Sequence, residues 1–280
     1  MPPCPSGHKR FKRTPATCLE RMSAIVTPRI SLYHSGMPCE ISTEEAAIVD
    51  RAKVFSRKNG KSISTELTDI EIYPSDPNPV SVFMAGSPGA GKTEASKALL
   101  ENVEKKGTST VRIDPDELRE RFEEYSGDNA WLFQPATSIL VDKIHDRVLK
   151  NEQNFLLDGT LSNYDIAKQN IERSLKRGRF VQILYVYQDP GMAWEFVKAR
   201  EELDGRRILP EHFIEQYFAA RKVVNQLKED FGKDIVVTLL LKNLDGSDKV
   251  YKANVDKIDN HIPEKYSESD LLEMISGAAE

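Results

Sequence analysis

The residues best suited to chemistry form a glycine-rich segment, 86–93, that ends in a lysine and a threonine. This spacing is that of a P-loop, in which glycines let backbone N–H groups close around phosphate oxygens at a helix N-terminus. Lys92 would contact the β- and γ-phosphates, and the Thr93 hydroxyl would bind Mg²⁺. A glycine-rich turn with a solvated lysine is the alternative. The segment predicts ATP binding with Mg²⁺ but no particular reaction, through Gly86, Ser87, Pro88, Gly89, Ala90, Gly91, Lys92 and Thr93.

Three carboxylates follow expected strands, at the edge where an α/β sheet gathers its ligands. Asp114 fits a helix N-cap, with Glu117 closing a capping box. Asp116 is not needed as a helix cap and would accept a proton from a hydroxyl that attacks the γ-phosphate. The alternative is a carboxylate at the start of a helix, where the helix dipole favours negative charge. Asp158 ends an apolar strand like a Walker B carboxylate that holds Mg²⁺. Its alternatives are substrate contact and a turn before Gly159.

Arginines surround a flexible break at 204–205, between two expected helices. Phosphoryl transfer needs cations that neutralise charge on the equatorial oxygens, and a mobile segment often supplies them. Arg200, Arg206 and Arg207 therefore indicate a lid. A solvated arginine cluster is the alternative. The histidines show no metal-ligand spacing.

The elements that must position these side chains alternate between strand and helix after residue 80, which is typical of a parallel sheet with crossover helices. Helices are expected from 92 to about 107, from 114, after 135 to 150, over 165–177, from 191 to about 202, and from 210 to about 231. The expected strands cover 80–85, 110–113, 155–157, 180–187, 235–241 and 249–251. The predicted fold class is α/β, a P-loop kinase fold whose mostly parallel sheet is flanked by helices, with a small helical N-terminal extension.

The N-terminal part differs from this pattern. Residues 1–41 begin with a basic, proline-containing stretch that predicts disorder. A capping box at Ser42 and Glu45 precedes an apolar helix that should stop near Gly60. Residues 64–73 are expected to be extended or a short helical piece, and the prolines of 74–79 mark a linker. The domains are therefore 1–41, the helical segment and linker 42–79, and the kinase domain 80–280.

Composition excludes several classes of function. The chain has 280 residues and a net charge of −5, which gives no basic excess for nucleic-acid binding. No apolar run approaches a membrane span of about 18 residues. The three cysteines lie within the first 39 residues and lack zinc-ligand spacing. A cytoplasmic protein without nucleic-acid or membrane partners is expected.

These motifs together resemble the zeta toxins, P-loop kinases of toxin–antitoxin systems that phosphorylate UDP-N-acetylglucosamine. The resemblance covers about 80–221 and rests on segments 86–93, 113–118, 158–160, 200–201 and 207–210. It implies Lys92 on the phosphates, Thr93 on Mg²⁺ and Asp116 as the base that deprotonates the sugar hydroxyl. Arg200 and Arg207 would stabilise the transferring phosphoryl group. The implied contacts to the sugar nucleotide are Asp158, Thr160 and Asp142.

Two departures concern the acceptor. The position of Asp158 is typically glutamate in zeta toxins, and Ser162 stands where many carry a basic residue. A kinase that phosphorylates another sugar nucleotide or an antibiotic hydroxyl would need little change in the P-loop or the lid. The alternative outside the kinases is a nucleotide-gated switch. Zeta toxins are restrained by a helical antitoxin that covers the nucleotide site. We hypothesise that 42–73 does the same in cis; a subdomain that merely packs is the alternative.

Overall fold

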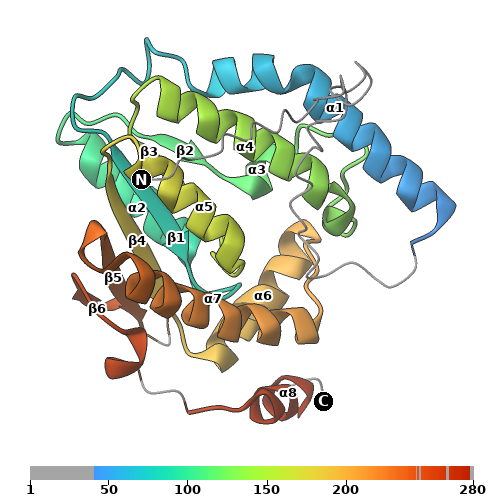
Figure 1. The fold of residues 1–280 in the computed structure, drawn as a ribbon. Helices are drawn as coiled ribbons and strands as arrows, with labels where there is room; N and C mark the ends of the chain where they lie inside the picture. Colours follow the sequence, from blue (N-terminus) through green and yellow to red (C-terminus); the bar gives the residue numbers. More distant parts are fainter. Residues whose placement is uncertain (1–40, 244, 246, 263–264, 278–280) are drawn as a thin grey trace, which may run out of the picture. The chain divides into compact units, whose positions relative to one another are not determined.

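The computed structural model describes residues 41–280 except 244, 246, 263–264 and 278–280, so that nearly all of the predicted disordered segment 1–41 lies outside it. Within this part of the chain, a six-stranded sheet has the order β2-β3-β1-β4-β5-β6 (Figure 1). All neighbouring strands are parallel except β5 and β6. The predicted α/β fold with a mostly parallel sheet is confirmed. The strands are β1 (Val80–Ala85), β2 (Val111–Ile113), β3 (Phe155–Leu157), β4 (Phe180–Tyr187), β5 (Ile235–Lys242) and β6 (Asp248–Lys252).

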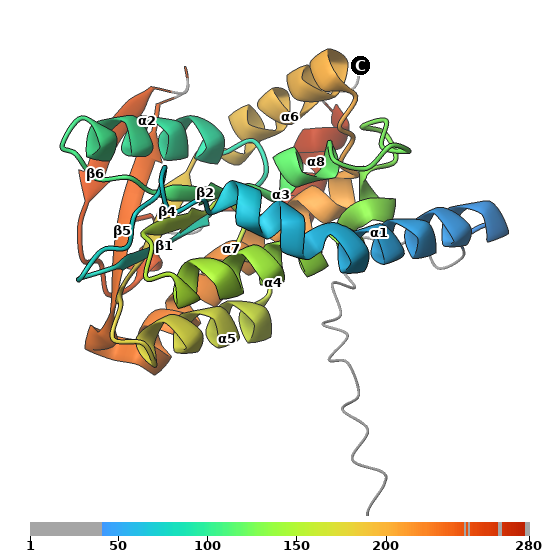
Figure 2. The same cartoon turned by 90° about the horizontal axis from the view of Figure 1, so that it is seen from above.

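Helices cover both faces of the sheet (Figure 2). The helices that the structure describes are α1 (Thr43–Leu67), α2 (Lys92–Glu104), α3 (Pro115–Arg119), α4 (Gln134–Lys150), α5 (Tyr164–Leu175), α6 (Pro190–Asp204), α7 (Pro210–Phe231) and α8 (Glu268–Gly277), with short 3₁₀ helices η1 (Ala130–Phe133), η2 (Gly232–Asp234) and η3 (Ile258–Asn260). None of the helices in the described ranges is long and apolar enough to cross a membrane.

The central strand β1 is buried on both sides, which explains its continuous apolar sequence. Val82 and Met84 face α2, and Phe83 and Ala85 face the layer formed by α4, α5 and α7. Because β1 lies between β3 and β4, the loops that follow these three strands open at one edge of the sheet. The predicted phosphate loop and the predicted acceptor residues therefore share this edge.

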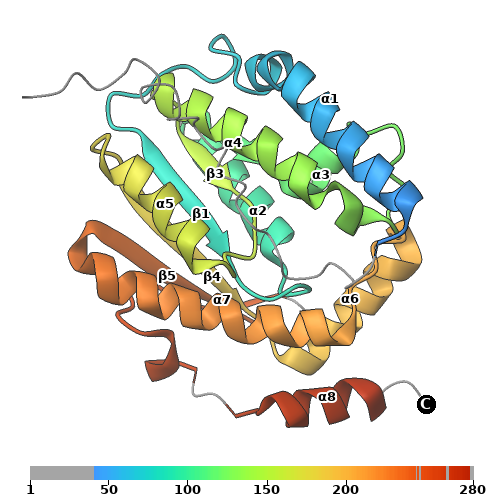
Figure 3. The same ribbon diagram turned by 45° about the vertical axis from the view of Figure 1, so that its right-hand side comes forward.

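Helix α1 is part of the main core. Ser42 Oγ accepts the Glu45 N–H at 3.2 Å, and the Glu45 carboxylate accepts the Ser42 N–H at 2.7 Å, so the predicted capping box is present. Val49, Ala52 and Ile63 are buried in the same cluster as the sheet and α4, along which α1 lies (Figure 3). Helix α1 and the sheet thus belong to one compact unit.

The expected end of α1 near Gly60 is wrong, because the helix continues to Leu67. A Cβ on Gly60 would lie 2.2 Å from Lys143 Cδ of α4. Gly60 therefore serves close packing between two helices rather than a helix end. The first residues of the segment 64–73, expected to be extended or a short helical piece, belong to this longer helix.

Helix α8 was not expected from the sequence. Its Leu271 and Ile275 are buried in a separate apolar cluster with Trp194 of α6 and Phe213 of α7. The cluster also contains Ala193 and Val197 of α6, which lie beside Gly89 of the P-loop, and α8 packs against both α6 and α7. The C-terminal segment thus braces the helix that leads to the predicted lid.

Candidate active site

The loop after β1 is shaped by three glycines in the left-handed region. Gly86, Gly89 and Gly91 have φ values of 137°, 70° and 82°. A Cβ on Gly86 would lie 2.3 Å from the Val186 carbonyl oxygen, and one on Gly89 would lie 2.0 Å from that of Ala193. The loop therefore packs directly against the end of β4 and the first turn of α6. The first N–H groups of α2 lack partners within the helix and suit a phosphate group.

Lys92 is the first residue of α2, and its ammonium group folds back over this loop. Its Nζ donates to the carbonyl oxygens of Gly86 at 3.0 Å and Ser87 at 2.7 Å. Burial lowers the pKa of Lys92 to about 8; the charge of Asp158 opposes this shift and that of Arg200 adds to it. The lysine is thus held at the loop by contacts that phosphate oxygens would replace.

Asp116 lies in the first turn of α3, directly after β2. The Asp114 carboxylate accepts the Asp116 N–H at 2.8 Å, so the predicted N-cap is present. Asp116 Oδ2 lies 2.9 Å from Arg206 Nη1 and 3.9 Å from Arg200 Nη1, and Oδ1 accepts a hydrogen bond from Arg119. Two cations from the lid side and one from α3 thus surround a single carboxylate.

The charges around Asp116 keep it ionised. Burial favours the protonated carboxyl, but the charges of Arg119, Arg200 and Arg206, with a smaller one from Lys92, outweigh it and lower the pKa. The Nε of Arg200 is buried and has no hydrogen-bond partner in the structure. A phosphate oxygen would satisfy this donor, because a buried unpaired N–H is costly.

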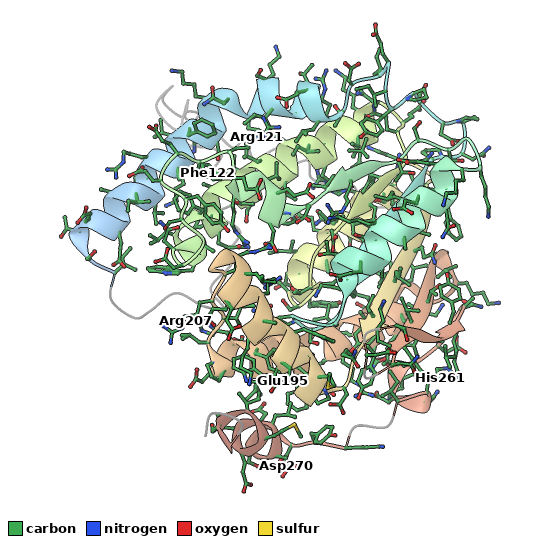
Figure 4. All side chains as sticks on the ribbon, turned by 180° about the vertical axis from the view of Figure 1, so that it is seen from behind. Arg121, Phe122, Glu195, Arg207, His261 and Asp270 are labelled. Carbon is green, nitrogen blue, oxygen red and sulfur yellow. The ribbon has the colours of Figure 1, made fainter. Side chains whose placement is uncertain are left out.

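Arg207 does not share this position. Its side chain is 66% exposed, and its recorded ion pair is with Glu201 at 3.7 Å. Figure 4 shows Arg207 extending outward beside α6. The predicted lid contains the cation at Asp116, but the residue that lies there is Arg206, one position earlier. Gly205 caps the C-terminus of α6 with φ 73°, directly before these two arginines.

The predicted acceptor contacts lie in different places. The Gly86 N–H donates to the Thr160 carbonyl oxygen at 3.2 Å, which places Thr160 beside the P-loop, with its hydroxyl 3.0 Å from that of Ser162. Asp142 lies on α4 with its side chain 64% exposed, 3.7 Å from Arg173 of α5. Its ion pair is therefore with the neighbouring helix α5 and not with a residue of the P-loop.

Asp158 is buried and already bonded. Its Oδ2 accepts from Ser96 Oγ and from Arg112 Nη2, both at 2.7 Å. Arg112 also pairs with Asp114 and Glu117. The predicted capping box at Asp114 is not formed, because the Asp114 side chain accepts the N–H of Asp116 rather than that of Glu117, and the Glu117 carboxylate turns to this arginine.

A cavity of about 670 Å³ lies beyond the ends of β4 and β5. Tyr187 and Gln188 line one side, and Lys242 and Asn243 line the other. A Cβ on Gly91 would lie 3.3 Å from Lys242 Cε, so this cavity adjoins the P-loop. Its size falls within the range of small-molecule sites, about 300–1,000 Å³.

Comparison with protein-family models matches residues 63–256 to the family described as Zeta toxin. The match contains the P-loop, α3 and the lid segment and covers well over half of the chain. The chain belongs to the zeta toxin family. A comparison with curated protein sequences found no match.

Solved structures agree with the zeta toxin assignment at the level of the fold. A structure of the PezAT chromosomal toxin–antitoxin system of the human pathogen Streptococcus pneumoniae has 18% identity and a TM-score of 0.50, and the alignment covers 84% of this chain and 88% of that chain. The AvrRxo1-ORF1:AvrRxo1-ORF2 structure with sulphate ions has 15% identity and a TM-score of 0.51, with coverage of 78% and 72%. The corresponding structure with ATP has 15% identity and a TM-score of 0.50, with coverage of 83% and 73%.

The sequence patterns assign no individual role to three arginines of this zeta toxin site. Arg206 was recognised only as part of a cluster. Arg119 follows Asp116 by three positions, and this helical spacing is the signal that would have paired them. Arg112 stands between two apolar strand residues, where a buried cation needs carboxylate partners, and Asp114 follows two positions later.

Proposed function

We propose that the protein is an ATP-dependent kinase that transfers the γ-phosphate to a hydroxyl group of a small molecule. The observation that carries this proposal is the placement of Asp116, which is ionised, close enough to Lys92 to affect its pKa, and in contact with cations from the lid. An acceptor hydroxyl beside Asp116 would face the γ-phosphate held at the P-loop. This is the arrangement that in-line phosphoryl transfer requires.

Each group has a defined part in the proposed reaction. The P-loop and Lys92 bind the phosphates of ATP, and the cavity beyond β4 and β5 accommodates its base. Bound Mg²⁺ would neutralise phosphate charge, with the Thr93 hydroxyl as its protein ligand; among the described residues no group of three or more His, Cys, Asp or Glu is arranged to hold a metal ion. Asp116 orients the acceptor hydroxyl and takes its proton, and Arg200 and Arg206 stabilise the transferring phosphoryl group.

The lowered pKa of Asp116 limits its strength as a base. This is compatible with phosphoryl transfer, because the transition state is loose and the hydroxyl proton leaves late. Asp116 then acts mainly by orienting the acceptor. Arg200 and Arg206, which pair with Asp116 in the structure, can then turn to the transferring phosphoryl group as negative charge develops on that group.

The proposed acceptor is a sugar hydroxyl of UDP-N-acetylglucosamine, and this choice rests on membership in the zeta toxin family. Its proposed contact is Thr160, whose carbonyl oxygen accepts the Gly86 N–H beside the P-loop. Asp158 contributes through Arg112 and Ser96, because its side chain is only 4% exposed. Asp142 is left out of the proposed acceptor site. The alternative acceptors are another sugar nucleotide and an antibiotic hydroxyl, which the same phosphoryl transfer would use.

We also propose that the kinase acts as a growth-inhibiting toxin restrained by a separate antitoxin. Support comes from the family match and from the likeness to a toxin–antitoxin structure. The hypothesis of restraint in cis by 42–73 loses weight, since α1 is part of the core and its recorded ion pairs to other elements reach Glu124 and Arg121. Its packing favours the alternative of a structural element.

The test is transfer of radiolabelled γ-phosphate from ATP, with Mg²⁺, to a panel of sugar nucleotides, free sugars and aminoglycosides. We expect label on UDP-N-acetylglucosamine or a close relative. ATP binding without transfer to any acceptor would favour the nucleotide-gated switch, in which bound ATP changes a partner surface. The Lys92→Ala variant is the control for P-loop dependence, because it should lose both binding and transfer.

A further inference from the structure

Arg112 lies where three segments of the active site meet. Its side chain is 12% exposed. The guanidinium pairs with Asp114 before α3, with Asp158 after β3 at 2.7 Å, and its Nε lies 3.3 Å from Ser96 Oγ of α2. Glu117, which is 59% exposed, is the outermost partner. One largely buried cation thus joins the P-loop helix to the ends of β2 and β3.

The first arm of this network reaches the proposed base. Asp114 Oδ2 pairs with Arg112, and Asp114 Oδ1 accepts the Asp116 N–H at 2.8 Å. With both oxygens engaged, the Asp114 carboxylate has one orientation. The start of α3, and with it Asp116, is therefore held in place through Arg112.

The second arm reaches the P-loop helix. Ser96 Oγ lies 2.7 Å from Asp158 Oδ2 and 2.9 Å from the carbonyl oxygen of Thr93. Asp158 in turn is held by Arg112. The first turn of α2, which carries Lys92 and Thr93, is therefore linked to the same guanidinium as Asp116.

The balance of charge shows why this cation is needed. Arg112 faces three carboxylates, of which Asp114 and Asp158 are buried. Burial raises the pKa of Asp114 to about 6; the charge of Arg112 opposes this shift, and those of Asp116 and Asp158 add to it. Removal of the arginine would leave two buried carboxylates that repel each other at the join between β2 and β3.

We propose that Arg112 is a positioning residue that fixes the turn bearing Asp116 relative to the P-loop helix. The inference rests on the proposed kinase function but concerns a residue that touches neither ATP nor acceptor in that proposal. Arg179 offers a matched comparison. It is a buried arginine before β4 that bonds Ser81 Oγ and the Val80 carbonyl oxygen, at the opposite end of the sheet.

The kinetic test compares Arg112→Met, Arg112→Lys and the control Arg179→Lys. In Arg112→Met we expect kcat to fall about 100-fold, because misplacement of a catalytic group by about 1 Å has that effect, while KM for ATP stays within about threefold. The acid limb of the kcat–pH profile should move to higher pH, since Asp114 loses the charge that favours its ionised form. Arg112→Lys should restore the limb and part of kcat.

A kcat for Arg112→Met within about threefold of wild type, or an unmoved acid limb, overturns the proposal. So does an equal loss in Arg179→Lys, which would mark the effect as general destabilisation. If Arg112→Met does not fold, Arg112→Lys decides: a lower kcat with unchanged KM for ATP supports positioning, and a wild-type kcat refutes it.

A second readout needs no acceptor. Amide hydrogen exchange at Asp116, in protein without ATP, should be about tenfold faster in Arg112→Lys than in wild type, while exchange in β4 and β5 stays unchanged. Equal exchange at Asp116 would overturn the proposal. If wild-type protein transfers phosphate to no acceptor, the proposed function fails, and the exchange measurement still decides the role of Arg112.

Discussion

Arg206 and Arg207 are consecutive, yet we expect Arg206→Ala to lower kcat far more than Arg207→Ala. Arg206 Nη1 lies 2.9 Å from Asp116 Oδ2, which in the proposed reaction places it beside the site where negative charge develops. Removal of one such donor typically lowers kcat about 10²- to 10³-fold, or about 2.7–4 kcal/mol. Arg207 is 66% exposed and 3.7 Å from Glu201. Such a surface pair is worth at most about 1 kcal/mol, which limits the loss to about fivefold.

The assay is initial-rate transfer of labelled γ-phosphate at saturating ATP, with acceptor concentration varied for each variant. Loss through the transition state should appear in kcat and in kcat/KM together. Loss of the Arg206 charge should also raise the pKa of Asp116, and titration of that carboxyl by NMR in Arg206→Ala gives a second readout. If Arg207→Ala lost more activity than Arg206→Ala, the lid geometry described above would be refuted.

Asp116→Asn should lower kcat about 10²- to 10⁴-fold with ATP affinity nearly unchanged, and a wild-type kcat in transfer assays would remove Asp116 as the base. Because Lys92 has a pKa of about 8, ATP should bind without proton uptake below pH 8 and with proton uptake above it, and its affinity should fall as the pH rises above 8. Calorimetry in buffers of different ionisation enthalpy would detect the proton uptake, and an ATP affinity that does not change with pH would contradict the prediction. A protein that starts at Asp76 should be insoluble or poorly folded by circular dichroism, because it lacks α1; a soluble, more active form would revive inhibition in cis.

The elements that could be predicted from the sequence are those defined by a strong pattern among residues close together in the chain. The P-loop strand, the alternation of strand and helix, and the cap at Ser42 depend on neighbours within a few residues, and all are present in the structure. Asp116 and Asp158 were also correctly expected to follow strands. Their surroundings were not predictable in the same way.

The remaining features depend on contacts between distant segments. Gly60 looked like a helix end, but its missing side chain serves contact with Lys143, a residue 83 positions later. Arg206 and Arg207 are told apart by their partners, since Arg206 reaches Asp116, 90 positions earlier in the chain, whereas Arg207 pairs with nearby Glu201. Whether Asp158 faces a substrate or an arginine depends on the partner strand β2. Such pairings come from the tertiary fold, which local spacing does not specify.

The close packing of the P-loop against α6 has a mechanical consequence. Helix α6 touches the loop at its first turn, where Gly89 meets the Ala193 carbonyl oxygen; it carries Arg200 near its far end, and Arg206 follows directly after its cap at Gly205. From Ala193 to the end of the helix is about 17 Å at 1.5 Å per residue. A rotation of about 5° at the loop would therefore swing the far end by about 1.5 Å, roughly half the length of a hydrogen bond. If nucleotide binding shifted the P-loop, α6 would therefore move the predicted lid arginines further than it moves the loop itself.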